Sequence, residues 1–395
     1  MRPAPAPGER PPGERVFSGT EFARRLAAVR RAMAAEDLDG LLVAKPENIY
    51  YLTGLDHWGF FAPHVLLVPA DGEMVLVARA MEAITMVRLL VNTRFSGHAD
   101  HEDPAGHVVQ AMAELGLAGG RLGIEKNSLF LTPRLADAIQ FGEPGADWRD
   151  ASRLVDDIRL VQSAEEIAYT RRAALAADAG MMAAIEAIHD GASDYEVAAE
   201  CHRAMILAGS EYPGFGPFIR PAARIGEEHT TWRGDRFHSG EPVFLELAAA
   251  CRKYQAPMGR LVYIGSAPGG IEAAVEMAIA GMAAIRQALR PGALAGDVYD
   301  AWHAVAAAYG LPDYHRHHCG YLVGIGFPPS WTGGSMVTGL APHSTRVLEP
   351  GMVFHAHSWF TNTDAADYFI SNTVLLTEQG AEVLTDATPE TLILR

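Results

Sequence analysis

Cysteine is scarce in this chain of 395 residues, which contains only Cys201, Cys251 and Cys319. The three are far apart, odd in number and without the paired spacing of metal-binding cysteines. A disulfide framework and a zinc knuckle are therefore excluded as organising features. The scarcity favours a reducing compartment, and we expect a cytoplasmic protein.

Long apolar runs and basic stretches are also missing. No segment reaches the roughly 18 apolar residues that a transmembrane helix needs. The formal net charge is −16 and no basic stretch stands out against it, which argues against nucleic-acid binding. The proline-rich opening lacks the apolar core of a signal peptide, so we expect residues 1–18 to form a disordered tail.

The length and the apolar pattern predict two domains. Residues 19–156 show helical periodicity over 21–36 and short apolar strands at 40–44, 64–69 and 73–78, which is typical of a small α/β domain. Residues 157–395 form the second domain. Its first long helix is predicted to begin at a capping box, Ser163-Ala164-Glu165-Glu166, and to end near Asp190, before Gly191.

The second domain contains an internal repeat. Residues 180–183 recur as residues 281–284, and His202 recurs as His303, each 101 positions later. Each copy predicts two helices separated by a glycine-containing break. A strand follows in each copy, and Glu246 and His357 each lie six residues after a glycine. Packing of the copies about a pseudo-twofold axis would bring these two side chains together in a cleft between the halves.

Glu246 is the charged residue that most needs an explanation. It is the only charged residue in the apolar run 243–251. Uncompensated burial of a carboxylate costs several kcal/mol, roughly, so Glu246 needs a partner, a shifted pKa or a function. The alternative is an edge strand whose glutamate points to water.

Other polar residues near Glu246 in sequence are candidates for the same site. His229, 17 residues earlier, is either a general acid or base or a surface histidine. Tyr254 and Arg260 either supply a phenol and a positive charge for an anionic substrate or are solvated hairpin residues. The run 315–321 holds three histidines, but adjacent side chains on an extended segment alternate and no carboxylate accompanies them, so we predict no metal there.

Aromatic residues supply two further candidates. Trp331 ends the glycine- and proline-rich run 324–331, which lacks the pattern of a nucleotide fingerprint and is expected to be a substrate-facing loop. Trp58 belongs to the aromatic segment 50–61, which either packs in a core or walls a pocket.

Three features together resemble the superfamily of creatinase, aminopeptidase P and methionine aminopeptidase. They are Tyr51-Leu52-Thr53-Gly54, the duplicated helical half and the turn Leu348-Glu349-Pro350-Gly351-Met352. The resemblance covers about residues 20–390. It implies an α/β (α+β) protein, with a creatinase-type N-terminal domain and a pita-bread catalytic domain built on a pseudo-twofold repeat.

Most members of that superfamily bind two metal ions through two aspartates, a histidine and two glutamates. Laid on this pattern, Glu246 and Pro257 replace the aspartates, Tyr321 replaces the histidine, and His357 and Ser371 replace the glutamates. Proline cannot ligate, and tyrosine and serine are poor substitutes in such a site. The resemblance therefore implies that the dimetal ligands are lost and that no metal cofactor is bound.

Within the superfamily, the sequence is most similar to the ectoine hydrolase branch. The motifs that carry this similarity are Asp56-His57-Trp58, His229-Thr230-Thr231-Trp232, Glu246-Leu247-Ala248, Cys251-Arg252-Lys253-Tyr254, Pro328-Pro329-Ser330-Trp331 and Phe354-His355. The similarity implies cleavage of a C–N bond in a small zwitterion without metal. It also implies a homodimer in which the Trp58 region reaches the partner's site.

We therefore expect a metal-independent hydrolase of a small zwitterionic amidine, guanidine or cyclic amide. Glu246 would act as nucleophile or general base, and His229 would protonate the leaving nitrogen. Arg260 would pair with a substrate carboxylate, and the remaining pocket residues would be Trp58, Tyr254, Tyr321, Trp331, His355 and His357. Two alternatives stay open. One is a metal-dependent Xaa-Pro peptidase-like enzyme whose altered ligands form a mononuclear site from Glu246, His355 and His357, with or without His229. The other is a binding protein without catalysis.

Overall fold

The computed structural model describes residues 16–332, 337–361, 363 and 366–395. The chain divides into two compact units, Met1–Arg159 and Leu160–Arg395. The division follows α6 (Leu154–Arg159), close to the boundary expected between residues 156 and 157. Among the described residues, every helix is too short or too polar to cross a bilayer.

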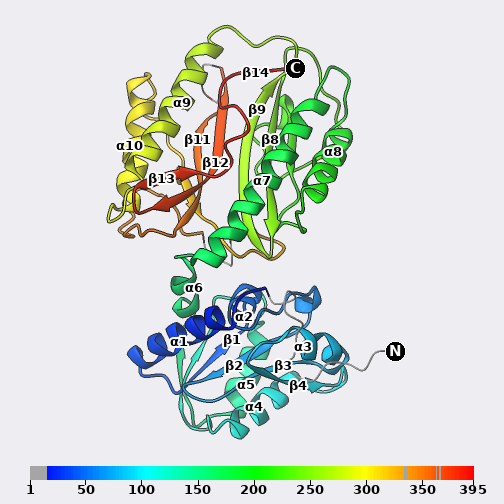
Figure 1. Ribbon diagram of the computed structural model, residues 1–395, viewed down its shortest axis with the longest axis vertical. Helices are drawn as coiled ribbons and strands as arrows, with labels where there is room; N and C mark the ends of the chain where they lie inside the picture. The colour runs from blue at the N-terminus through cyan, green and yellow to red at the C-terminus, as the bar shows by residue number, and fades with distance from the viewer. Residues whose placement is uncertain (1–15, 333–336, 362, 364–365) are drawn as a thin grey trace. The chain divides into compact units, whose positions relative to one another are not determined.

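The N-terminal unit is built on a six-stranded sheet in the order β4-β3-β2-β1-β5-β6 (Figure 1). Apolar side chains of its central strands pack against α4 and α5. The predicted helix and the three predicted strands are all present. The elements are α1 (Gly19–Ala35), β1 (Gly40–Val43), α2 (Pro46–Thr53), η1 (Gly59–Phe61), β2 (Val65–Pro69), β3 (Met74–Arg79), η2 (Ala80–Glu82), α3 (Ala83–Leu89), β4 (Thr93–His98), α4 (Pro104–Glu114), β5 (Arg121–Ile124), α5 (Pro133–Gly142), β6 (Asp147–Asp150) and α6.

The expected tail, residues 1–18, falls mostly outside the described residues. Its last three residues belong to the folded unit, because Val16 and Phe17 are buried and the Ser18 side chain caps α1 by accepting a hydrogen bond from the Glu21 amide.

The C-terminal unit contains an eight-stranded sheet with the path β10-β11-β12-β9-β8-β7, to which β13 and β14 add at β12 and β9. The predicted capping box is present, since Ser163 and Glu166 bond reciprocally at the start of α7. The elements are α7 (Ala164–Ala187), α8 (Asp194–Leu207), β7 (Phe218–Pro221), η3 (Ala222–Arg224), β8 (Pro242–Cys251), β9 (Tyr254–Tyr263), α9 (Ile271–Ala288), α10 (Ala295–Ala308), β10 (Gly320–Leu322), β11 (Val353–Phe360), β12 (Tyr368–Thr377), β13 (Gly380–Val383) and β14 (Ile393–Leu394).

The two halves of this unit repeat one arrangement, as the sequence predicted. In each half a helix pair is followed by three strands, α7–α8 with β7–β9 and α9–α10 with β10–β12 (Figure 1). Helix α10 begins and ends 101 residues after α8. Helix α7 lies against β8 and β9, and α9 lies against β11 and β12.

Strand alternation decides which side chains face away from the helices. On β8, Val243, Leu245 and Leu247 share one apolar cluster with residues of α7 and α8. Glu246 lies between the last two of these, so it projects from the opposite face of the sheet. This face, uncovered by α7 and α8, carries the candidate site.

Candidate functional site

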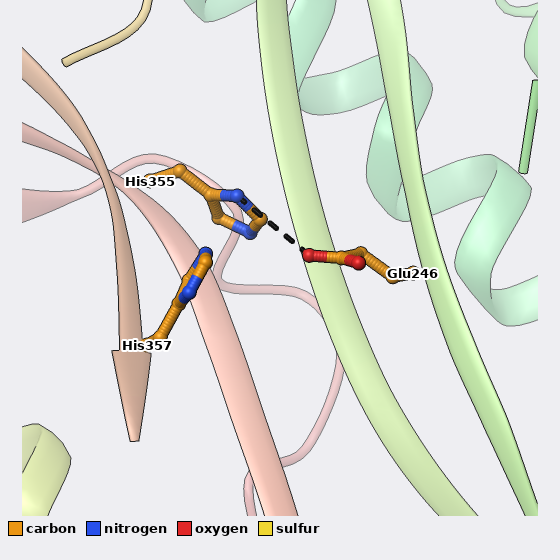
Figure 2. Close-up of side chains that lie close together, drawn as sticks. All are labelled: Glu246, His355 and His357. Carbon is orange, nitrogen blue, oxygen red and sulfur yellow. Dashed lines mark ion pairs between the residues drawn. The ribbon is translucent and has the colours of Figure 1, made fainter. Parts of the chain in front are cut away.

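Glu246, His355 and His357 gather on this face (Figure 2). One potential ligand atom from each lies within 4.8 Å of the others, and all three residues are buried. Glu246 comes from β8, whereas both histidines come from β11, so each half of the repeat contributes to the cluster. The predicted convergence of Glu246 and His357 is therefore present in the structure.

Small residues on the two intervening strands make room for the cluster. Gly259 of β9 pairs with Glu246 on one side and with Ser371 of β12 on the other, and Ser371 pairs with His357. Residues that pair directly share a face, so all four positions face the site. A Cβ atom on Gly259 would lie 2.2 Å from the Phe369 ring and 2.9 Å from Ser371 Oγ, which only glycine avoids.

Glu246 is held in an environment that favours its protonated form. Burial raises the pKa of Glu246 to about 8, while the positive charges of Arg220 and Arg316 oppose the rise and Glu228 adds to it. The Oε1 atom of Glu246 lies 3.9 Å from Nδ1 of His355. A carboxyl group that gains or loses its proton near neutral pH is typical of a catalytic acid or base.

His355 lies at the centre of a buried hydrogen-bond network. Its Nδ1 is 2.9 Å from the Tyr321 hydroxyl and its Nε2 is 2.7 Å from Ser371 Oγ, while Trp331 Nε1 donates to the same Tyr321 oxygen at 2.8 Å. The Tyr321 hydroxyl donates to Nδ1, and the Nε2–H group donates to Ser371 Oγ. One N–H donor and one acceptor nitrogen, as in a neutral imidazole, are enough for both bonds. Burial keeps the pKa of His355 well below its usual value, so the imidazole is neutral.

His357 has no such network. Its Nε2 is buried without a hydrogen-bond partner in the described part of the chain, and its ring centroid lies 4.0 Å from that of His355. Burial also lowers the pKa of His357 well below its ordinary value. The wall around Glu246 is therefore polar but uncharged on this side.

A cavity of about 340 Å³ opens onto Glu246 and His357. His229 lines it from the loop after η3, with its ring centroid 6.0 Å from that of Phe218 and 6.4 Å from that of Phe215. The cavity therefore holds two candidate proton-transfer groups in an aromatic enclosure. Its lining residues are Phe215, Phe218, Glu228, His229, Glu246, Arg316, His317, His318, Tyr321, Ser330, Trp331, Thr332, Val337, His357 and Trp359.

Arg260 does not take the predicted place, and its proposed pairing with a substrate carboxylate is corrected. It follows Gly259 on β9 and thus points to the opposite face of the sheet. Its guanidinium uses all five N–H donors. They bond to the carbonyl oxygens of Gly259, Ser371, Thr388 and Pro389 and to Asn372 Oδ1. Arg260 is a structural residue that ties the chain's C-terminal segment to the sheet.

Tyr254 is likewise placed away from the cavity, and its predicted pocket role is corrected. Its hydroxyl donates to Glu166 Oε1 at 2.6 Å, and its ring stacks on Tyr169 of α7. Like Arg260, it lies on the helix-covered face. Trp58 belongs to the N-terminal unit, where it is 65% exposed, and its part in a pocket stays a prediction.

Ten of the fifteen lining residues were not among the predicted site residues, and three of the ten matter most for the geometry. Phe218 pairs directly with Glu246 across β7 and β8, Phe215 precedes the same strand, and Arg316 lies over the Trp359 ring with its guanidinium carbon 4.1 Å from the ring centroid. Strand β7 is only four residues long, which is too short for a recognisable apolar alternation. Arg316 was visible only as part of the histidine-rich run.

The two-metal centre of most members of the resembled superfamily does not fit these residues. The cluster offers one carboxylate, whereas oxygen-rich dinuclear sites need several. Glu246, His355 and His357 could hold one ion, for which a glutamate and two imidazoles are suitable ligands. His355 would first have to give up one of its two hydrogen bonds. The run 315–318 is not part of this ligand group in the described residues.

Comparison with known proteins supports this architecture. Residues 168–378 match the model of metallopeptidase family M24, and residues 25–161 match the creatinase/prolidase N-terminal domain. Ectoine hydrolase from Halomonas elongata is 30% identical over 389 residues, covering 94% of this chain and 96% of that protein. Xaa-Pro dipeptidase from Pyrococcus furiosus is 24% identical over 368 residues, covering 93% and 99%.

A solved structure agrees with the fold. The Xaa-Pro dipeptidase from Bacillus anthracis matches with a TM-score of 0.83 at 20% identity, over 95% of this chain and all of that one (100%). The predicted fold class is confirmed, with a creatinase-type N-terminal domain and a pita-bread C-terminal domain.

Proposed function

The chain belongs to metallopeptidase family M24, and from that premise we propose that it hydrolyses a C–N bond in a small zwitterion without a metal ion. The substrate class is an amidine, guanidine or cyclic amide, as in the similar ectoine hydrolase. The observation that carries the proposal is the environment of Glu246. This carboxyl group opens onto a cavity, beside two imidazoles whose pKa is lowered by burial, and the resemblance assigns its position to a metal ligand.

Glu246 acts on the electrophilic carbon in one of two ways. As a nucleophile, a carboxylate oxygen bonds to this carbon, the C–N bond breaks, and water later hydrolyses the covalent intermediate. As a general base, Glu246 takes a proton from the water that attacks. In both routes His229, which lines the same cavity, gives a proton to the leaving nitrogen. Both routes need ionised Glu246, and a cationic substrate group beside it favours that form.

The test uses chelator-treated protein with ectoine, creatine and Xaa-Pro dipeptides as substrates. We expect the wild-type protein to turn over a small zwitterion. Glu246→Gln and His229→Ala should each lose at least about 10²-fold in activity. The control variants Glu241→Gln and His238→Ala change residues outside the cavity and should keep near-normal activity. Full activity in Glu246→Gln would refute the mechanism.

The two routes differ in a single turnover. When limiting substrate is mixed with enzyme and the reaction is stopped by rapid denaturation, a nucleophilic Glu246 carries the substrate-derived group as a mass increase on its peptide. A general base leaves the Glu246 peptide unmodified.

A second candidate is a metal-dependent hydrolase of the Xaa-Pro dipeptidase type, favoured by the ligand geometry of Glu246, His355 and His357. It predicts about one bound metal ion per chain, loss of activity on chelation and recovery with Zn²⁺. It also predicts that Glu246 works as an anion well below pH 8, since a bound cation lowers a ligand's pKa. Elemental analysis and the pH profile of kcat/KM separate the two candidates.

The remaining inferences rest on the resemblance. We infer a cytoplasmic homodimer, with Trp58 reaching the partner's site. Light scattering and a Trp58→Ala variant test these points. Tight ligand binding without turnover of any substrate would instead support a non-catalytic binding protein.

A further inference from the structure

Arg220 on β7 is a buried cation that makes no ion pair with a carboxylate among the described residues. It is 1% exposed, and its Nε and Nη1 atoms have no hydrogen-bond partner in the described part of the chain. Its guanidinium carbon lies 4.1 Å from the centroid of the Phe244 ring. A cation–π contact recovers only part of the cost of removing an arginine from water.

The neighbouring arginines show what a structural role looks like in this fold. Arg260 is equally buried, and every one of its donors is bonded. Arg224, four residues after Arg220, makes an ion pair with Asp235. Arg220 has neither kind of partner among the described residues, and because it is not one of the residues that line the cavity, a ligand that bonds to it must extend from the cavity toward β7.

The strand register directs Arg220 toward the candidate site. Phe218 pairs with Glu246 and Arg220 pairs with Phe244 across β7 and β8. All four residues therefore project from the same face of the sheet. Arg220 and Glu246 are diagonal neighbours, whose Cα atoms lie about 7–8 Å apart in such a pair.

A second arginine extends this positive region to the cavity wall. Arg316 lines the cavity and stacks on Trp359, whose ring centroid lies 5.2 Å from that of Phe244. Arg316 is already paired with Glu228, 3.2 Å away. Arg220 is thus the uncompensated charge of the two.

We propose that Arg220 anchors the carboxylate of a zwitterionic ligand, with Arg316 at the entrance to this subsite, while Glu246 faces the cationic end of the same molecule. The inference rests on the proposed function and specifies its substrate class: the anionic group and the reacting C–N unit are a few bonds apart. Arginine suits this role because its fork of N–H donors matches a carboxylate. In this proposal Arg220 pairs with the substrate carboxylate, the role that the sequence predicted for Arg260.

The experiment measures binding of ectoine and of its neutral carboxamide by calorimetry, in a Glu246→Gln background, where the expected loss of activity keeps the ligand intact during the titration. Three changes are each combined with Glu246→Gln. Arg220→Met removes the positive charge and keeps a long side chain, and Arg220→Lys keeps the charge without the guanidinium fork. Arg203→Met, on the surface of α8, is the control. We expect Arg220→Met to weaken ectoine binding by about 10- to 100-fold and carboxamide binding by less than about threefold. Arg220→Lys should lie between, and Arg203→Met should bind as the background does.

Thermal unfolding without ligand separates this role from a structural one. A ligand-binding Arg220 predicts that the free Arg220→Met protein is at least as stable as the background, because an unpaired buried charge is gone. Equal losses of ectoine and carboxamide affinity, or a clear loss of stability in the free variant, would overturn the subsite. Failure of the proposed function has another signature: ectoine binds through Arg220, yet the wild-type protein does not hydrolyse it.

Discussion

Replacing Glu246 by glutamine should stabilise the protein and remove part of its pH dependence. The carboxyl group has a pKa of about 8 in the folded state, because of burial, and a usual value of 4.5. Folded protein therefore holds this proton more tightly than unfolded protein does. Glu246 therefore contributes most to the free energy of unfolding below about pH 4.5, and this contribution is lost as the pH rises toward 8.

The magnitude follows from the same two values. Each unit of pKa difference corresponds to about 1.4 kcal/mol, so the penalty is about 3 kcal/mol at pH 7 and approaches about 5 kcal/mol above pH 8. Glutamine has nearly the same shape and no charge to bury. Glu246→Gln should therefore match wild type near pH 4.5 and be several kcal/mol more stable at pH 9.

Urea unfolding of wild type, Glu246→Gln and the control Glu241→Gln at pH 5, 7 and 9 measures this difference. Other titrating groups cancel, because they are common to all three proteins. A stability difference between Glu246→Gln and wild type that stays constant across this range would refute the burial of a titrating Glu246. A bound metal ion gives the opposite sign, since it would stabilise the ionised glutamate that the variant lacks.

Three further predictions concern the scaffold of the site. Gly259→Ala should reduce kcat/KM by more than about tenfold, because the added Cβ would lie 2.2 Å from the Phe369 ring and displace it. Steady-state assays test this, with Ala256→Gly on the same strand as the control. Arg260→Met should lower the free energy of unfolding by about 3–5 kcal/mol, since buried carbonyl groups lose their hydrogen-bond donor. A selective rise in KM without destabilisation would contradict the structural role of Arg260. Tyr321→Phe should cost about 1–3 kcal/mol in urea unfolding, because Trp331 Nε1 and His355 Nδ1 each lose a partner; unchanged stability would exclude the network.

The sequence was sufficient to predict Glu246 and His357 at one site because the repeat supplies long-range information. Two equivalent strands related by a pseudo-twofold axis must bring equivalent positions together, whatever the loops between them do. The two domains and their first elements were predictable from local apolar periodicity. These features depend on patterns that extend over many residues.

The errors at Arg260 and Tyr254 have a different origin. Whether a strand residue faces a cavity or a helix layer depends on the parity of its position, and one residue reverses the answer. Gly259 faces the site, so Arg260 and Tyr254 face away from it. The sequence around them contains no signal of that parity, because β9 is buried on both faces along its whole length. Arg220 was missed for the related reason that β7 could not be recognised.

The residues of this site differ in charge from those of a two-metal centre. In a two-metal centre the cations neutralise several carboxylates, and the site then attracts anionic or electron-rich groups through the metal. Here a single carboxyl group is neutralised by a proton, the two imidazoles are uncharged, and the charge left over is that of Arg220. A ligand with one positive and one negative group satisfies both ends, because its cation ionises Glu246 while its anion pairs with Arg220. Under the proposed function, the pocket without ligand would therefore favour a zwitterion, whose cationic group would ionise Glu246 for the reaction.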